Sequence, residues 1–367
     1  MFIYATEHLL VYKMTIKKIG FACKLSELHP IKGVVSIPEY NSRSTTVSWL
    51  NRQSKDVAET KLWELMEHNI EAAKKAVAYV GNLEENLRCF RLGSDILPVY
   101  TERHWSYFWR QPDVVSYCET HFKRVGDVAR NSNVRLSMHP GQFTCIVSDN
   151  PGIVDRSIAE LEYHTNMIRW MGFGQSKLDV KLNIHLSGRR GVDGFNDAWN
   201  KMSPELRNCL TLENDEYQKG LDDLLILKDK VGIVLDIHHH LIKEDEYIQS
   251  NDPRIQQVIE SWQGVRPTFH YSQSRDEYIN KFLDRIPSMS EMLTTAKKSK
   301  LRAHSDFYTN RKINEWALTH LEWADCMAES KAKNLASAEL FNQWRESNGI
   351  VSSLAHRHTL DDAVLRI

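Results

Sequence analysis

Eight short apolar segments, spread over most of the chain, constrain the fold more than any other feature of the sequence. Each has the length of a strand, and they cover residues 18–22, 88–92, 134–139, 180–185, 210–213, 233–236, 268–271 and 325–329. Between them, residues 56–80, 157–171 and 217–230 repeat apolar side chains at the three- and four-residue spacings of an amphipathic helix. Strands that alternate with helices form parallel sheets, so eight of them predict an α/β fold, a single closed (β/α)₈ TIM barrel.

No linker rich in Pro, Gly or Ser divides this pattern, so we expect one domain. The first clear strand segment follows Met14, and residues 1–16 are predicted to be an N-terminal extension. The TIM-barrel domain is predicted to cover residues 17–335. Residues 336–367 are predicted to form a closing helix and a polar C-terminal tail.

The composition is that of an ordinary globular protein, with 42% apolar and 26% charged residues. A formal net charge of -1 argues against a generally basic nucleic-acid-binding surface, but a local basic groove or bound metal stays compatible with it. The six cysteines are scattered without a CxxC pair, which favours a reducing compartment. No run approaches the ~20 apolar residues of a membrane span. We therefore expect a soluble, cytoplasmic monomer that does not bind membranes.

Imidazole and carboxylate side chains lie at or near the ends of six successive predicted strands. They are His139, His185, Glu213, Asp236, His270 and Glu329. In a (β/α)₈ barrel the carboxyl ends of the strands meet on one face, where catalytic residues lie. Imidazoles and carboxylates are natural ligands of divalent metals such as Zn²⁺ or Mn²⁺. The sequence therefore predicts a metal site on this face.

Each of these residues has a structural interpretation when it is taken singly. His139 could cap a turn, and His185 could be a satisfied core histidine. Glu213 and Glu329 could be salt-bridge partners, or acids favoured by the dipole of a helix N-terminus. Independent coincidence at six successive strand ends is much harder to accept, so the joint interpretation as a metal site is favoured.

Residues 134–143, which read VRLSMHPGQF, join a predicted strand to a turn on the expected catalytic face. Apolar and polar residues alternate until the strand stops at a Pro-Gly pair directly after His139. Gln142 and Phe143 follow the turn. This stretch therefore delivers a histidine to the face and an amide and an aromatic ring to its rim.

Arg189 and Arg190 follow His185 by a short loop and are expected on the same rim. They could hold phosphates, although an exposed arginine pair is more often only solvated. His304 lies in the segment Ala303-His304-Ser305-Asp306, which has no predicted strand of its own. The strand pattern alone therefore gives His304 no role.

The motifs around these residues resemble those of the UV damage endonuclease family. They occur in the family's order from about residue 17 to residue 335, and SMHPGQ and LEND together are specific. The matching segments are Ile19-Gly20-Phe21, Phe90-Arg91-Leu92-Gly93, residues 136–143, Asn183-Ile184-His185, Leu212-Glu213-Asn214-Asp215, residues 236–239, His270-Tyr271-Ser272, His304-Ser305-Asp306 and Glu329-Ser330-Lys331.

The resemblance implies a TIM barrel related to endonuclease IV that holds a cluster of divalent metals. The family's metal is often manganese, so Mn²⁺ is the ion expected here, with Zn²⁺ and Mg²⁺ as alternatives. The implied partner is double-stranded DNA with UV lesions. The implied reaction is a nick on the 5′ side of a UV photoproduct, which leaves a 3′-hydroxyl.

The resemblance also implies how the metal ligands are shared. They fall into three groups: His139, His185 and Glu213 for one ion; Glu213, Asp236, His270 and Glu329 for a second; and His239 and His304 for a third. His104 matches a further histidine of the family. The residues expected to carry catalysis are Glu213, His139, His185, Asp236 and Glu329.

Other matching positions concern the lesion. Gln142 and Phe143 match the pair that probes the damaged dinucleotide from within the duplex. Phe21 matches an aromatic residue, commonly Tyr, beside that pair. The chain departs from the family at Thr268, two residues before the histidine of the seventh strand, where the family often has a lysine reported to be carboxylated. A hydroxyl cannot form a carbamate, which affects the occupancy of the third site or the metal preference.

Three other functions fit the same barrel. An abasic-site endonuclease would use a similar metal cluster. A metal-dependent sugar isomerase would need a small closed pocket and would have no use for Gln142 and Phe143 on an open rim. A damage-binding protein that has lost catalysis is compatible with Thr268, although the retained ligand set argues against it.

Overall fold

The computed structural model describes residues 16–141 and 143–349. Its main sheet has eight strands in the order β8-β7-β6-β5-β4-β1-β10-β9, and all neighbouring strands are parallel. The strands are β1 (Ile19–Ala22), β4 (Cys89–Leu92), β5 (Arg135–Met138), β6 (Lys181–His185), β7 (Leu210–Glu213), β8 (Gly232–Val234), β9 (Thr268–Tyr271) and β10 (Asp325–Ala328). All eight coincide with the strands predicted from the sequence.

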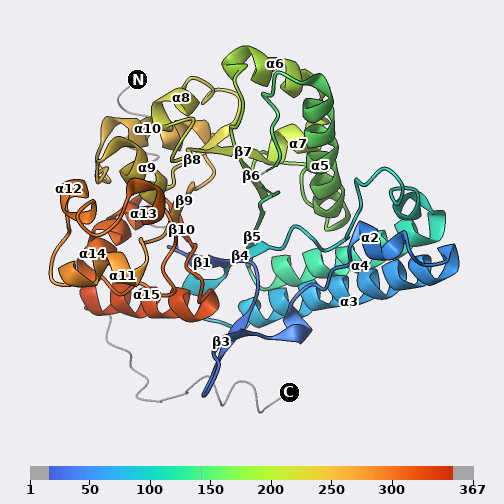
Figure 1. Cartoon of the computed structure of the whole chain (residues 1–367), viewed down its shortest axis with the longest axis horizontal. Helices are drawn as coiled ribbons and strands as arrows, with labels where there is room; N and C mark the ends of the chain where they lie inside the picture. Colours follow the sequence, from blue (N-terminus) through green and yellow to red (C-terminus); the bar gives the residue numbers. More distant parts are fainter. Residues whose placement is uncertain (1–15, 142, 350–367) are drawn as a thin grey trace.

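The sheet closes on itself where β8 meets β9. Asp236, just after β8, forms a parallel bridge with His270 of β9, and the His270 N–H donates to the Leu235 carbonyl at 2.9 Å. The helices surround this ring of strands (Figure 1). The predicted α/β fold, a single (β/α)₈ TIM barrel, is thus confirmed, and two of the predicted metal ligands lie at the point of closure.

Helices of very different length cover the strands. They are α2 (Val47–Leu50), α3 (Lys55–Gly81), α4 (Pro112–Asn131), α5 (Pro151–Trp170), α6 (Gly191–Lys201), α7 (Pro204–Cys209), α8 (Leu221–Leu225), α9 (Ile237–Glu244), α10 (Pro253–Ser261), α11 (Asp276–Ile279), α12 (Met289–Met292), α13 (Lys298–Leu301), α14 (Arg311–Leu318) and α15 (Asn334–Ser347). The two helices predicted over residues 56–80 and 157–171 are confirmed as α3 and α5. Helix α3 begins where Ser54 accepts a hydrogen bond from the Val57 N–H.

The helix predicted over residues 217–230 is wrong in extent, because only Leu221–Leu225 is helical. The Asp215 carboxylate accepts the N–H groups of Tyr217 and Gln218 at 2.5 and 2.7 Å, which folds the first residues into a turn. The apolar spacing continues beyond Leu225, but the chain there runs in hydrogen-bonded turns. A buried turn and a helix can therefore share the same spacing.

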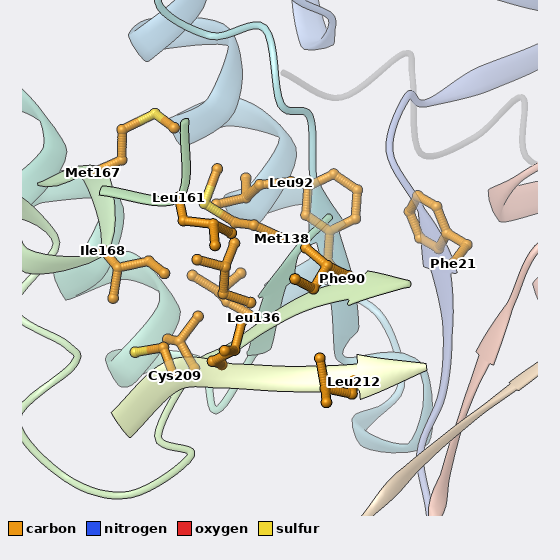
Figure 2. Packing of buried hydrophobic residues seen from close by; sticks show 14 of the residues in the cluster. Phe21, Phe90, Leu92, Leu136, Met138, Leu161, Met167, Ile168, Cys209 and Leu212 are labelled. Atoms are coloured by element: carbon orange, nitrogen blue, oxygen red, sulfur yellow. The ribbon is translucent and has the colours of Figure 1, made fainter. Parts of the chain in front are cut away.

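One hairpin, formed by β2 (Ser26–His29) and β3 (Gly33–Ser36), was not predicted from the sequence. It projects from the barrel (Figure 1) and is largely exposed, so it lacks the apolar run that marks the barrel strands. The core lies between strands and helices. Leu136 and Met138 of β5 pack near Leu161 and Ile168 of α5 (Figure 2).

Helix α15 packs against β1, where Ser337 Oγ donates to the Ile19 carbonyl at 3.2 Å. The domain boundaries at residues 16 and 335 stay predictions, and most of the proposed extension and tail lies outside the described residues. Within the described part of the chain, no helix is long and apolar enough to cross a membrane. All six cysteines are free thiols.

Candidate metal centre

The strand ends bring histidine and carboxylate side chains into two groups that could each hold a metal ion. In each group the ligand atoms lie within 4.8 Å of one another. The first group is His139, His185 and Glu213, and the second is Glu213, Asp236, His270 and Glu329. Both groups lie on the face where the carboxyl ends of the strands meet.

Glu213, the last residue of β7, belongs to both groups. Its Oε2 lies 3.4 Å from His139 Nε2 and 3.9 Å from His185 Nε2. Its Oε1 lies 3.1 Å from His270 Nδ1. Burial would raise the pKa of Glu213, but the charges of His270 and His185 hold this pKa well below its ordinary value. The carboxylate is therefore ionised, with one oxygen directed at each group.

Glu329 follows β10 and is held by an arginine from β4. Arg91 Nη1 donates to Glu329 Oε1, and the same oxygen lies 3.2 Å from His270 Nδ1. Burial would raise the pKa of Glu329, but Arg91 and His270 keep it well below the ordinary value. Arg91 thus fixes one carboxylate oxygen and neutralises part of the negative charge of the group.

The two carboxylate oxygens of Asp236 have different surroundings. Its Oδ1 accepts the backbone N–H groups of His238 and His239 at 2.8 and 2.7 Å, which caps the start of α9. Its Oδ2 is buried and has no hydrogen-bond partner. Burial raises the pKa of Asp236, and the charges of Glu213 and Glu329 raise it further. A buried carboxylate oxygen without a partner fits a cation ligand, because it is otherwise costly.

Outer contacts orient the ligands. His139 Nδ1 lies 2.8 Å from the Pro140 carbonyl, so this nitrogen donates and Nε2 keeps its lone pair for the group. Metal-ligating imidazoles usually donate their second N–H to such a backbone carbonyl or to a carboxylate, as the ring of His139 does here. Asn183, two residues before the end of β6, donates from Nδ2 to Glu213 Oε2.

A lysine that the sequence analysis did not identify reaches the cluster from β6. Lys181 Nζ lies 2.6 Å from His270 Nε2, and only 3% of this residue is exposed. Burial lowers the pKa of Lys181 to about 7. Alternate residues of a strand share one side, so the segment Lys181-Leu182-Asn183-Ile184-His185 places Lys181 on the same side as His185. This alternation is the sequence signal that could have identified Lys181. Thr268, where the family often has a lysine, is buried on β9.

The predicted third group is less complete. The rings of His239 and His304 have centroids 6.3 Å apart, and His239 Nδ1 lies 3.5 Å from Glu213 Oε1. Burial would lower the pKa of His239, but the carboxylates around it, Asp236 first, raise this pKa to about 9. Among the residues that the structure describes, neither histidine belongs to a group of three ligands. His104 is exposed and also belongs to neither group.

His139, His185 and Glu329 of the two candidate metal-binding groups line a cavity of about 400 Å³. Phe143 lines it and is 85% exposed, which is unusual for a side chain of this size. His185, Glu216, His239 and His304 line the same cavity. Gln142, the predicted partner of Phe143, lies outside the described residues.

Phe21 does not lie where the resemblance to the family placed it. It is 1% exposed, and its ring centroid is 5.1 Å from that of Phe90 in the core between the strands and the helices (Figure 2). A ring enclosed by the core cannot contact DNA, so its assignment to the lesion is corrected to a packing role. The spacing of β1 gave no means of telling an inward from an outward aromatic ring.

Arg189 and Arg190 lie on the surface after β6 and are paired with acids. Arg189 Nε is 2.8 Å from Asp149 Oδ2, and its side chain is 89% exposed. Arg190 Nη2 is 2.5 Å from Asp197 Oδ2. Exposed ion pairs of this kind contribute little to stability, so both guanidiniums can exchange their partners for a phosphate.

The donor atoms of the two groups fit a divalent cation. Imidazole nitrogens and carboxylate oxygens from neighbouring strands suit ions such as Zn²⁺ and Mn²⁺. Fold and site together therefore define a class: a (β/α)₈ barrel with a face of histidine and carboxylate side chains that could hold metal ions.

Comparison with known proteins places the chain in one family within this class. The family model described as "UV-endonuclease UvdE" matches residues 17–356, and the chain belongs to this family. A UV DNA damage endonuclease of Bacillus cereus strain B4264 is 25% identical over 321 residues, which cover 84% of this chain and 91% of that protein. The UV-damage endonuclease of Schizosaccharomyces pombe is 27% identical over 344 residues, or 90% of this chain and 51% of that protein.

A solved structure supports the fold. The crystal structure of SacUVDE superposes with a TM-score of 0.68 at 19% sequence identity, over 90% of this chain and 99% of that one. At this identity the similarity establishes the barrel, while the arrangement of the site rests on the distances given above.

Proposed function

We propose that this protein is a metal-dependent endonuclease that nicks duplex DNA on the 5′ side of UV photoproducts. The observation that carries the proposal is the pair of histidine–carboxylate groups that share Glu213, since His139, His185 and Glu329 of these groups line an open cavity. Membership of the UV-endonuclease family supplies the substrate class. An open rim with an exposed aromatic ring suits a polymer better than it suits a small sugar.

Two cations, with Mn²⁺ as the first choice and Zn²⁺ or Mg²⁺ as alternatives, would supply neutralisation of the phosphate, a nucleophile at neutral pH and stabilisation of the departing 3′-oxygen. The protein's own residues prepare the place. Glu213 stays ionised and offers one oxygen to each group. Arg91 fixes Glu329, and the Pro140 carbonyl fixes the ring of His139. These contacts hold the donors in place before substrate arrives.

Phe143 would recognise the damage rather than cut the strand. Photoproducts weaken pairing and stacking, so a lesion costs less to extrude from the duplex than an intact step does. A ring that is 85% exposed beside the metal-binding groups could fill the gap that the lesion leaves. Arg189 and Arg190 would contact the backbone nearby, and Gln142 would act with Phe143.

The test uses purified protein, Mn²⁺ and end-labelled duplexes that carry one cyclobutane dimer, one abasic site or no lesion. We expect a single incision 5′ to the dimer and a product that a polymerase can extend from its 3′-hydroxyl. Cleavage of the abasic duplex alone would identify an abasic-site endonuclease instead. Binding of the dimer duplex without any incision would identify a damage-binding protein.

Replacing Phe143 separates recognition from cutting. Phe143→Ala is expected to weaken binding to the dimer duplex by about 10- to 100-fold, because stacking on an aromatic ring contributes about 1–3 kcal/mol per base. Binding to the undamaged duplex and the melting temperature should stay unchanged, because the ring is exposed. Exposed Leu293→Ala on the outer surface is the control. If Phe143→Ala bound each duplex with the same affinity as the parent protein, Phe143 would have no part in recognition.

A further inference from the structure

The loop after β7 carries a second aromatic side chain to the cavity, and no strand end or family motif singled it out. Tyr217 is 56% exposed and lines the same 400 Å³ cavity as Phe143, His139 and His185. Both rings stay exposed, although aromatic side chains gain from burial of their large apolar surface. Two of them on one cavity above a metal-binding face point to a ligand with flat, stackable groups.

An arginine lies against the Tyr217 ring. Arg302 Cζ is 4.8 Å from the ring centroid, and Arg302 Nη1 is 2.9 Å from Glu216 Oε1. The Arg302 side chain is 45% exposed, so its guanidinium remains accessible from the cavity. Arg302 is the single lysine or arginine among the described residues that line this cavity. Among the described lining residues, Arg302 therefore provides the only permanent positive charge, while Asp215, Glu216 and Glu329 provide carboxylates.

Hydrogen bonds within the loop hold the pair in place. The Asp215 carboxylate accepts the N–H groups of Tyr217 and Gln218, and the Asp215 N–H donates to the Lys219 carbonyl at 2.8 Å. Glu216, which binds Arg302, also lies 3.7 Å from His239 Nε2. The ring and the guanidinium are thus oriented before any ligand binds, which lowers the entropic cost of binding.

We propose that Tyr217 and Arg302 form a nucleotide platform: the ring stacks on an unpaired base of the substrate DNA, and the guanidinium binds the adjacent phosphate. The platform rests on the proposed function and specifies where the extruded nucleotide is held. Aromatic rings stack on every base, and a guanidinium matches the geometry of a phosphate. A phosphate that approaches the carboxylates of this cavity needs such a cation, because it would otherwise meet like charges.

The test compares four variants with the parent protein: Tyr217→Ala, Tyr217→Phe, Arg302→Gln and Arg285→Gln. Arg285 is a matched control, because it also pairs with a glutamate, Glu291, and lies 5.1 Å from the centroid of an aromatic ring, Phe282, but does not line the cavity. The probe is a duplex with a bulged 2-aminopurine, and phosphorothioate linkages protect the bulge from cleavage. Binding and 2-aminopurine fluorescence are measured in Mn²⁺ at several salt concentrations, with metal content and melting temperature as checks.

We expect Tyr217→Ala to raise Kd about tenfold and to relieve part of the fluorescence quenching. Tyr217→Phe should stay within about twofold of the parent, because the ring is kept. Arg302→Gln should raise Kd and lower the slope of log Kd against log salt by about one, the value for one lost phosphate contact. Arg285→Gln should match the parent in every measurement.

Parent-like binding by Tyr217→Ala and Arg302→Gln, in a protein that still incises the dimer duplex, would overturn the platform and leave the proposed function intact. A loss in Tyr217→Phe as large as that in Tyr217→Ala would also overturn it, because stacking does not need the hydroxyl. Failure of the parent protein to bind or incise damaged DNA would remove the proposed function and the platform together.

Discussion

The two ends of the barrel each bury a cluster of charges, but only one cluster is closed by hydrogen bonds. At the amino ends of the strands, Asp325 accepts from Arg135 Nη1 at 2.5 Å, from Arg266 Nε at 2.9 Å and from the Lys18 backbone N–H at 3.0 Å. We call these four residues the amino-end network. At the carboxyl ends, Asp236 Oδ2 is buried without a hydrogen-bond partner.

The carboxyl-end cluster, which consists of Glu213, Asp236, His270 and Glu329, instead crowds three carboxylates around one imidazole. Like charges that are buried together disfavour the metal-free state, and a bound cation relieves this repulsion. In the amino-end network both carboxylate oxygens of Asp325 already accept hydrogen bonds, so neither needs a bound cation. Unsatisfied charge, rather than buried charge as such, therefore distinguishes the carboxyl end of this barrel, where the candidate metal centre lies, from the amino end.

Glu213→Gln tests the carboxyl end and should have the largest effect. Incision should fall at least about 1000-fold, because a neutral amide can neither join the two metal groups nor stabilise their cations. The bound metal, measured by mass spectrometry, should fall in parallel, while the far-UV spectrum stays that of the parent. Exposed Glu260→Gln is the control. Retained incision and metal content would remove Glu213 from the centre.

Asp325→Asn tests the amino end. It should lower the free energy of unfolding by about 3–5 kcal/mol, because Arg135 and Arg266 would lose the counter-charge that balances their burial. Denaturant titration measures this loss. Incision per folded molecule should match the parent at low temperature. A stable variant with impaired incision would contradict the division between the two ends.

A smaller effect is expected in the pH dependence of the unfolding free energy. In the metal-free protein the pKa of His239 is raised from 6.5 to about 9, so its contribution to stability is complete below pH 6.5 and is lost as the pH rises through 9. The difference in unfolding free energy between the parent and His239→Asn should shrink by about 3 kcal/mol over this range. His121→Asn, at a half-exposed position outside the cavity, is the control. A constant difference would show that the carboxylates do not stabilise protonated His239.

The sequence predicted the order of the barrel strands and the chemical types of the ligands. Eight apolar segments became eight parallel strands, because a buried parallel strand needs an apolar run and leaves a clear local signal. His139 and Glu213 could be named as candidate ligands because each stands at or directly after the end of such a run. Where the local signal was ambiguous, at residues 217–230, the predicted helix was too long, since side-chain capping by Asp215 competes with helical spacing.

The tertiary structure decided which side chains meet. Lys181 and His270 are 89 residues apart, and Arg302 and Glu216 are 86 apart, so no local pattern could pair them. The burial of Phe21 depends on the helices that cover the outer face of the closed sheet, because its ring lies on the side of β1 opposite to the barrel interior. The sequence by itself thus determined which donors the barrel carries and at which strand ends they stand. Closure of the barrel decided which of them form each candidate metal-binding group, because it brings distant strands within hydrogen-bonding distance.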